Sequence, residues 1–309
     1  MPLIITPQHP PPWTLESDGI FVIPAADAAR QDIRPLRVLL VDLMPEAVGL
    51  QQQLERLIGN TPLQVELVVA QLGASASGPA PWDAHAGERF DGLIISNAQA
   101  GDRPVHAVPA WDELRDLLDW SQDHVHAALF LGWSALAALD HFYGVPALPL
   151  PAPLVGVYRH RVRRRQSYLL RGFDDLYDAP ISRQHQPDPA WLRDSPWLEI
   201  LAESEEGGPA IIRNRSRRQV FVTSAPHYEP GHLVLDHAQG GAGGGGQRYT
   251  LPACTWRAHA QLLVANWLNY YVYQASPYHL EQLTPMVMPG GGRRVTPLPG
   301  AIGRPPGAG

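Results

Sequence analysis

The sequence predicts an α/β fold in which a mostly parallel sheet is flanked by helices and continued by an antiparallel extension. Between residues 36 and 143, apolar runs rich in Val, Ile and Leu alternate with segments of helical periodicity. Strands that alternate with helices are typical of βαβ crossovers in a parallel sheet. After residue 143 the apolar pieces become shorter and follow one another closely up to residue 223. This spacing favours antiparallel pairing at one end of the same sheet.

The composition excludes several classes of partner. The 309-residue chain has a formal net charge of −6, so it lacks the basic surface that nucleic acid or an anionic membrane requires. All 24 basic residues are arginines, which excludes a catalytic or phosphate-binding lysine. The single cysteine, Cys254, cannot form an internal disulfide, and no run of about 18 apolar residues indicates a membrane span. We therefore expect a cytoplasmic protein.

One domain is expected at residues 36–280, preceded by an N-terminal arm at residues 1–35. The arm is rich in proline, and we expect it to pack over the domain without regular structure. The first half of the domain alternates between strands and helices. Strands are expected at residues 36–43, 63–69 and 90–96, and helices at residues 47–58 and 111–120.

Residues 125–138 are the most informative stretch. An apolar run breaks at Gly132, and an alanine-rich helical pattern then extends to residue 143. The pattern predicts a buried strand, a sharp turn and a helix, the arrangement that lifts a nucleophile clear of the sheet in α/β enzymes. The residue at the apex is Gly132, which has no side chain that could react.

The rest of the domain predicts the antiparallel extension, a loop and one long helix. The apolar pieces lie at residues 154–158, 167–170, 197–202, 209–213 and 219–223. Five arginines between residues 159 and 165 favour a solvated hairpin over an anion site. Residues 238–250 form a Gly-rich loop, and its glycine run at residues 238–247 lacks the lysine and the Ser or Thr of a phosphate loop. Residues 256–274 have the pattern of an amphipathic helix, and residues 281–309 that of a disordered tail.

Five longer motifs carry a family resemblance. They lie at residues 31–37 (QDIRPLR), 57–65 (LIGNTPLQV), 169–175 (LLRGFDD), 198–205 (LEILAESE) and 266–274 (NWLNYYVYQ). Together they resemble the homoserine O-succinyltransferase family of methionine biosynthesis, over about residues 20–280. The resemblance implies a fold like that of class I glutamine amidotransferases and a double-displacement acyl transfer. An elbow cysteine would take the acyl group from acyl-CoA and pass it to the hydroxyl of homoserine, assisted by a His and a Glu.

This chain departs from the family at all three triad positions. The family elbow His-Ile-Cys-Trp-Gly-Ala aligns with residues 130–135 (FLGWSA), which places Gly132 at the cysteine. The family segment Thr-Gly-His-Pro-Glu-Tyr aligns with residues 223–228 (TSAPHY), which places Ala225 at the base and His227 at the carboxylate. The chemistry requires a thiolate, a base and an orienting carboxylate, and none of the three is present at its position.

Substrate contacts that the resemblance implies are also changed. Pro153 stands where the family has a lysine, and Gln239 where an arginine would bind the amino-acid carboxylate. The loop Thr-Gly-Ala-Pro-Val-Glu, which helps shape the oxyanion site, is replaced by residues 96–101 (SNAQAG). Ser182 and Arg183 keep the family's pocket-lining pair. Together with Trp133, they are the substrate-binding residues that we expect.

Three functional hypotheses remain open. The first is a catalytically degenerate family member that acts as a binding or partner subunit, as a homodimer or as a heterodimer with an active homologue, since the resemblance implies dimers. The second is an active acyltransferase in which the acceptor attacks the acyl-CoA directly and His227 acts as the base. The third is a sensor in which Ser182 and Arg183 hold a carboxylate or acyl group. No resident cofactor is expected, and acyl-CoA would be a ligand or co-substrate.

We expect the other side chains that could react or bind a ligand to have structural roles. The hydroxyl of Ser134 is expected to cap the first helical turn and not to replace the nucleophile. Cys254 is expected to be a partly buried structural thiol. No metal site is expected at the scattered histidines, His124, His126, His185, His227, His232 and His237. The aromatic residues of the long helix, Trp256, Trp267, Tyr270, Tyr271 and Tyr273, favour a core or subunit contact over ligand stacking.

Overall fold

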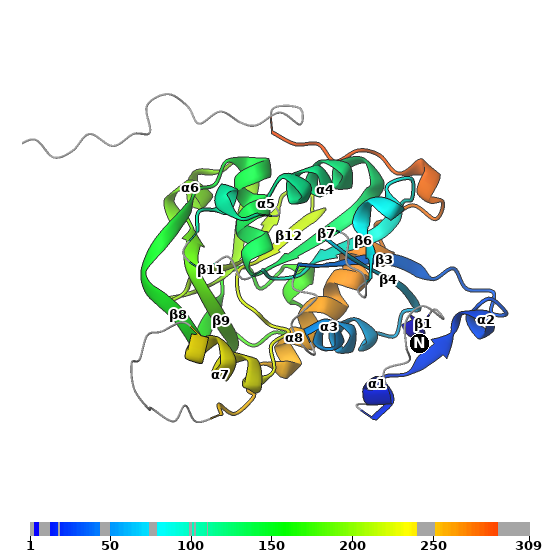
Figure 1. Ribbon diagram of the computed structural model, residues 1–309, viewed down its shortest axis with the longest axis horizontal. Coiled ribbons are helices and arrows are strands. Elements are labelled where there is room, and N and C mark those ends of the chain that lie inside the picture. The colour runs from blue at the N-terminus through cyan, green and yellow to red at the C-terminus, as the bar shows by residue number, and fades with distance from the viewer. Residues whose placement is uncertain are drawn as a thin grey trace, which may run out of the picture.

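A single sheet forms the centre of the molecule (Figure 1). The computed structural model describes residues 3–5, 13–17, 19–43, 50–73, 79–98, 101, 103–109, 111–239 and 251–289. The strand order is β2-β1-β4-β3-β6-β7-β12-β11-β10-β8-β9, with β5 paired to β4. The α/β prediction, with parallel strands followed by an antiparallel extension, is confirmed.

The parallel part of the sheet is buried on both faces, as its apolar runs predicted. Its strands are β3 (Leu36–Asp42), β4 (Val65–Gln71), β5 (Ala80–Pro81), β6 (Phe90–Ile95), β7 (Val125–Leu131) and β12 (Gln219–Val222). Helix α3 (Leu50–Gly59) connects β3 to β4, α4 (Trp111–His124) connects β6 to β7, and α5 (Trp133–Tyr143) follows β7. Short 3₁₀ turns lie at Trp82–His85 and Val105–Ala107.

Four antiparallel strands extend the sheet beyond β12. They are β8 (Ala147–Val162), β9 (Leu176–Pro187), β10 (Leu198–Ser204) and β11 (Gly208–Asn214). The sequence pattern did not predict β9. Residues 167–170, expected as a further strand, form the 3₁₀ turn Tyr168–Leu170 instead. Helix α6 (Pro189–Asp194) follows β9 and is capped by the Asp188 carboxylate.

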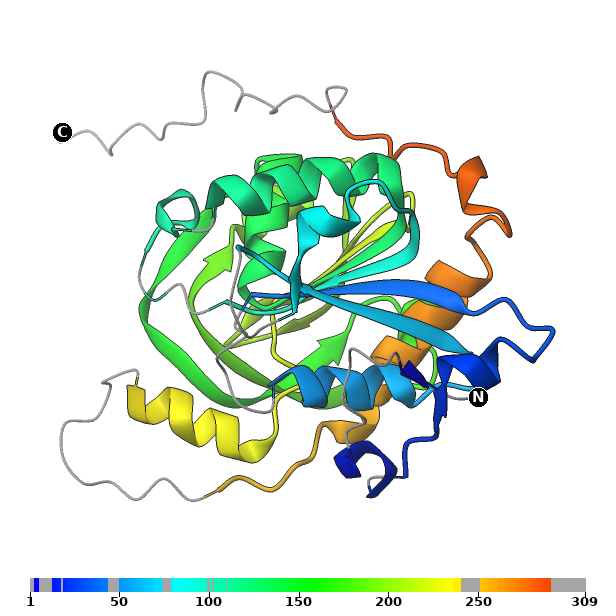
Figure 2. The same ribbon diagram turned by 45° about the vertical axis from the view of Figure 1, so that its right-hand side comes forward.

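Helices cover both faces of the sheet and enclose two apolar cores. Figure 2 shows α4 and α5 over one face of the parallel strands, and α3 and α8 (Arg257–Asn266) over the other. The long C-terminal helix begins as predicted but continues as a π-helix, Trp267–Tyr273. A Cβ atom on Gly92 of β6 would lie 2.8 Å from the Trp267 ring, so the glycine allows this indole to pack directly on the sheet. Trp256, Trp267 and Tyr271 are buried, which confirms a core role for these three aromatic residues.

Both chain ends contain more regular structure than the sequence predicted. In the N-terminal arm, β1 (Leu3–Ile5) pairs in parallel with β4, and β2 (Val22–Pro24) pairs with β1. The arm also contains the short helices α1 (Trp13–Ser17) and α2 (Ala25–Ala28). Its expected lack of regular structure is therefore wrong for the described residues.

Part of the expected disordered tail packs against the domain. Met286 and Met288 are buried in the core on the α4–α5 side, and the Met286 N–H donates to the carbonyl of Gln122. The prediction of disorder is thus wrong for residues 281–289, because Met286 and Met288 pack into a core whose other residues are distant in sequence, which a local pattern does not reveal. Residues 290–309 lie outside the described residues, as do residues 240–250 of the expected Gly-rich loop.

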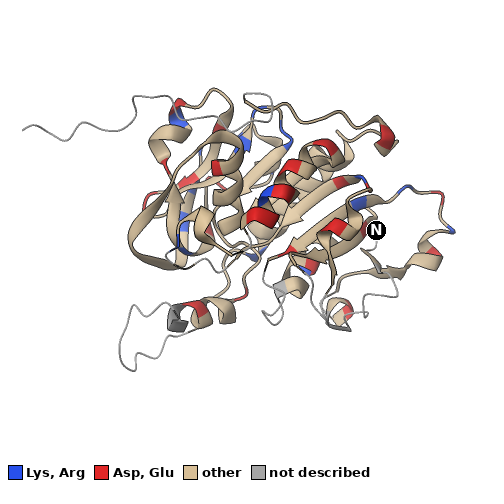
Figure 3. Ribbon diagram, turned by 45° about the horizontal axis from the view of Figure 1, so that its top comes forward, with Lys and Arg blue, Asp and Glu red and all other residues tan. Residues whose placement is uncertain are grey.

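The arginine-rich hairpin is compensated by acidic neighbours, in agreement with its interpretation as a solvated surface. Figure 3 shows acidic and basic segments interspersed on the ribbon. The ion pairs of this hairpin are Arg159–Asp178, Arg163–Glu203, Arg164–Glu199 and Arg165–Asp175.

We expect the stacked pair formed by Phe221 of β12 and Phe130 of β7 to be essential for stability. Phe221 is fully buried and stacks on Phe130 with ring centroids 5.2 Å apart. Phe221→Ala should lower the free energy of unfolding by about 3–5 kcal/mol, measured by urea denaturation. Phe21→Ala, at a side chain that is 66% exposed, is the matched control and should change it by less than about 0.5 kcal/mol. Equal effects of the two changes would contradict this assignment of the core.

Candidate functional site

The predicted sharp turn between β7 and α5 is present, with Gly132 at its apex. Gly132 has φ 62° and ψ −122°, in the region of positive φ that side chains disfavour. Its N–H donates to the carbonyl of Val222 at 2.7 Å. This bond joins the elbow to the end of β12, which immediately precedes the segment 223–228.

The side chain of Asn97 occupies the space in front of the elbow. A Cβ atom on Gly132 would lie 2.3 Å from Asn97 Oδ1 and 2.6 Å from its Cγ. The same Oδ1 accepts a hydrogen bond of 2.7 Å from the Trp133 N–H. In a nucleophile elbow, the N–H that follows the nucleophile is an oxyanion-hole donor. Here that donor is already bound by an internal amide, and Gly132 supplies no nucleophile.

Asn97 begins a polar chain that extends across the site. Its Nδ2 donates to Tyr228 Oη at 3.3 Å, and Tyr228 interacts in turn with Asp236 of α7 (Pro230–Gln239). Ser182 donates to Asp236 Oδ2 at 2.5 Å. Burial, followed by the charge of Asp236, raises the pKa of Tyr228, so its phenol remains protonated. Ser182, expected to bind substrate, is therefore hydrogen-bonded within the protein.

Arg183 lies next to Ser182 on β9 and also bonds internally. Its guanidinium donates to the carbonyl of Thr223 at 3.1 Å and to that of Gly207. Burial lowers the pKa of Arg183 to about 10, which still leaves it charged at neutral pH. In the described part of the chain no carboxylate pairs with it, so Arg183 is a cation whose partners are main-chain dipoles.

The remaining predicted site residues line the same region without forming a catalytic pair. Ala225 is buried, and its N–H donates to the carbonyl of Pro180 at 2.8 Å. His227 is 3% exposed, and neither ring nitrogen has a hydrogen-bond partner. Burial, followed by repulsion from His232, lowers the pKa of His227 to about 3. A general base works best with a pKa near the working pH, so His227 is poorly suited to accept a proton. The Trp133 side chain is buried, and its indole N–H has no partner.

Comparison with known proteins identifies the family. The family model described as homoserine O-succinyltransferase matches residues 2–278. The chain belongs to the homoserine O-succinyltransferase family. It is 38% identical to the homoserine O-acetyltransferase of Desulfitobacterium hafniense, over 92% of this chain and 99% of that protein. It is 40% identical to the homoserine O-succinyltransferase of Shewanella piezotolerans, over 92% of this chain and 97% of that protein.

Solved structures support the fold that the resemblance implied. A glutamine amidotransferase from Methylobacillus flagellatus superposes with a TM-score of 0.52 at 11% identity, over 80% of this chain and 99% of that one. A glutamine amidotransferase from Thermotoga maritima gives a TM-score of 0.51 at 9% identity, over 78% and 100% of the two chains. This member of the homoserine O-succinyltransferase family thus has a glutamine amidotransferase-like fold.

Neither Ser134 nor Cys254 lies at the elbow apex of this family member. Ser134 is 1% exposed, and its hydroxyl lies 3.0 Å from the carbonyls of Ile95 and Leu131 while accepting from the Leu131 N–H. The expectation that it caps the first helical turn is wrong, since its bonds run back to the ends of β6 and β7. Cys254 is partly buried just before α8.

The histidines are distributed over several strands and helices. Within the described residues, no group of three or more His, Cys, Asp or Glu side chains could hold a metal ion. His124 stacks on Trp120, and His232 Nδ1 lies 2.8 Å from Gln53 Nε2. The side chains of His237 and Gln239 lie outside the described residues. The helices of the described chain are too short or too polar to cross a membrane.

Asn97 is the site residue that the sequence did not assign. The only signal for it was the departure of residues 96–101 from the family loop. Its role depends on a contact with Trp133, 36 positions further along the chain.

We expect Asn97 to make Gly132 intolerant of any side chain. Gly101 provides a matched control, because it has φ +62° but no atom within 4 Å of its would-be Cβ. Gly101→Ala should cost about 1–3 kcal/mol of backbone strain, and Gly132→Ala should cost more because of the added clash. Urea denaturation measures both. Asn97→Ala should recover part of the Gly132→Ala loss, and simple additivity of these two changes would contradict the clash.

Acid should destabilise the protein partly through His227. Its folded-state pKa of about 3 lies below the ordinary value of 6.5, so the unfolded chain binds the extra proton first as the pH falls. Stability should therefore decline between about pH 6.5 and pH 3. His227→Leu should reduce this decline by up to about 1.4 kcal/mol per pH unit, measured by urea denaturation between pH 4 and pH 8. An unchanged pH dependence in the variant would refute the assignment.

Proposed function

We propose that this chain keeps the homoserine O-acyltransferase scaffold of methionine biosynthesis, has lost covalent acyl transfer, and serves as a non-catalytic binding or partner subunit. The observation that carries the proposal is the 2.7 Å hydrogen bond from the Trp133 N–H to Asn97 Oδ1, directly in front of Gly132. Asn97 thereby fills the space that a nucleophilic side chain would need. It also accepts the hydrogen bond of the Trp133 N–H, which a tetrahedral intermediate would need as a donor.

The double-displacement mechanism of the family supports the proposed loss of covalent acyl transfer. A double displacement needs a nucleophile that forms an acyl-enzyme and a base that activates it. Gly132 and Ala225 replace these two groups, and His227 replaces the orienting carboxylate. In serine proteases, removal of the triad leaves only about 10³–10⁴-fold catalysis over water, part of it from the oxyanion hole. With the Trp133 N–H already bonded, even that residual contribution is reduced.

A partner role follows from what the chain retains. The chain aligns with its relatives along almost its whole length, while the triad positions and substrate contacts that the resemblance implies are substituted. We propose that it forms a homodimer, or a heterodimer with an active homologue, in the cytoplasm. Acyl-CoA remains a candidate ligand, held without turnover, and we propose no resident cofactor.

The alternative is direct attack of an amino-acid hydroxyl on acyl-CoA, with His227 as the base. Arg183 favours it, because a charged guanidinium without a carboxylate partner among the described residues could hold the substrate carboxylate. The low pKa of His227 opposes it, since the proton would have to enter a buried site that disfavours the charged imidazole.

We expect no acyl-enzyme and no turnover in the purified protein. The chain should be incubated with succinyl-CoA or acetyl-CoA, with and without homoserine, and followed by intact mass and product chromatography. No acyl mass should be added, and no O-acylhomoserine should accumulate. Formation of product at ordinary enzyme rates would refute the proposal. If product forms and His227→Ala abolishes it while Ser134→Ala and Cys254→Ala do not, the direct-attack alternative is correct.

A further inference from the structure

The long strand β8 has a neighbouring strand on both sides over only a short part of its length. Strand β9 pairs with it along one edge up to Arg161, whereas β10 pairs only with residues 160–162 along the other edge. Figures 1 and 2 show β8 along the left margin of the molecule. In the part of the chain that the structure describes, no strand pairs with this second edge before residue 160.

The backbone of Val157 points to this open edge. Val157 lies opposite Pro180 of β9, and the Pro180 carbonyl accepts from the Ala225 N–H on the far side of β9. The N–H and C=O of a residue in an antiparallel strand point to the same side, so Val157 and Pro180 exchange no hydrogen bond. Val157 therefore points away from β9. Val155 and Arg159 point the same way, because the direction alternates along a strand.

Hydrogen bonds further along the chain agree with this alternation. The Val162 N–H donates to the carbonyl of Asp175 on the β9 side, and the Arg163 N–H donates to the carbonyl of Leu201 in β10. The odd-numbered residues of this part of β8 thus face the edge where β10 lies. Strand β10 ends at Ser204, opposite His160. Among the described residues, none bonds to the backbone of residues 155, 157 and 159 at that edge.

Both ends of this open edge are closed to a further strand, but its middle is not. Strand β10 covers it from residue 160, and three residues before it lack an N–H donor, namely Pro149, Pro151 and Pro153. Natural proteins use prolines, charges or a covering element to keep edge strands from pairing. Residues 155–158 are uncharged, and the charge of Arg159 is paired with Asp178 of β9. Residues 155–159 are therefore an unprotected edge segment.

The edge segment is complementary to itself. In antiparallel pairing around a two-fold axis, one register uses all three outward-facing residues. It places Val157 opposite Val157 of the second copy and Val155 opposite Arg159. No like charges lie opposite each other in this register. A longer foreign strand would gain little more, because no N–H is available at Pro153 and β10 already occupies the edge at residue 161.

Helix α7 offers apolar surface for the same contact. It packs against β8 and carries Leu235, whose side chain is 57% exposed. The two-fold axis between antiparallel edge strands is perpendicular to the sheet, so the α7 helices of two copies would lie on the same face of the joined sheet. Burial of exposed leucines between them would add to the backbone hydrogen bonds.

We propose that residues 155–159 of β8 are the interface at which two copies of this chain join their sheets edge to edge around a two-fold axis. The inference rests on the homodimer proposed above and names its surface. It does not depend on whether acyl transfer has been lost.

The unmodified chain provides the first test. Light scattering at micromolar concentration should give the mass of a dimer. In that dimer, the amides of Val155, Val157 and Arg159 should exchange with deuterium nearly as slowly as those of Gly156 and Tyr158, which face β9. A monomer or a larger assembly would overturn the interface. Fast exchange of the three outward-facing amides in a dimer would overturn it too, while leaving the homodimer intact. Loss of catalysis is tested separately, by turnover.

Variants at one position then separate the backbone from the side chain. Val157→Pro removes the outward-facing N–H and should raise the dissociation constant of the dimer at least about 30-fold, measured by sedimentation. Val157→Ala keeps the N–H and is the matched control, which should raise it less than about fivefold. Equal constants for the two variants would contradict the pairing of backbones. If Val157→Pro does not fold, as judged by urea denaturation, the exchange measurement on the unmodified chain still decides.

Discussion

The parallel pairing of β7 and β12 is the constraint on which the rest of the site depends. Phe221 lies opposite Phe130, and Val222 lies opposite Leu131. The Gly132 N–H then bonds to the Val222 carbonyl, so the elbow and the segment after β12 leave the sheet side by side. In parallel strands both segments emerge at the carboxyl ends, which is where α/β folds build their binding sites. A change of register would separate them.

Within that frame, the side chain of Asn97 fills the space in front of the elbow. The positive φ of Gly132 keeps the elbow geometry, while the Asn97 amide provides the hydrogen bond that the buried Trp133 N–H requires at the start of α5. A buried N–H without a partner is costly, so an elbow whose site is closed to ligands needs an internal acceptor. Tyr228 and Asp236 extend this internal bonding and bring Ser182 into it. The polar groups of the site therefore stabilise the protein itself.

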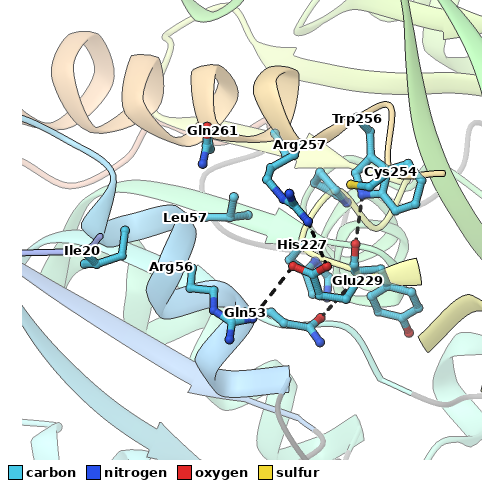
Figure 4. A pocket seen from close by; sticks show the side chains of 13 residues that line it. Ile20, Gln53, Arg56, Leu57, His227, Glu229, Cys254, Trp256, Arg257 and Gln261 are labelled. Carbon is cyan, nitrogen blue, oxygen red and sulfur yellow. Dashed lines mark hydrogen bonds and ion pairs between the residues drawn. The ribbon is translucent and has the colours of Figure 1, made fainter. Parts of the chain in front are cut away.

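The segment 225–229 has a different environment on each side. Tyr228 bonds to Asn97 at the elbow, whereas Glu229 pairs with Arg56 of α3 and with Arg257 at the start of α8 (Figure 4). His227 precedes both residues in sequence, and its buried ring makes no hydrogen bond. At the position that we propose for the family carboxylate, the chain thus has a neutral imidazole whose two nitrogens have no hydrogen-bond partner.

The sequence by itself determined most of the strands and helices between residues 36 and 143, the apex at Gly132 and the family, because apolar periodicity, the positions of glycines and the order of motifs are local properties. Through the resemblance, it also led us to propose Gly132, Ala225 and His227 as the triad positions. Only the tertiary structure decided that Asn97 closes the elbow, that Ser182 and Arg183 bond internally, and that residues 281–289 pack on the core. These features depend on contacts between residues tens of positions apart, and local patterns carry no information about which distant side chains the folded sheet brings together.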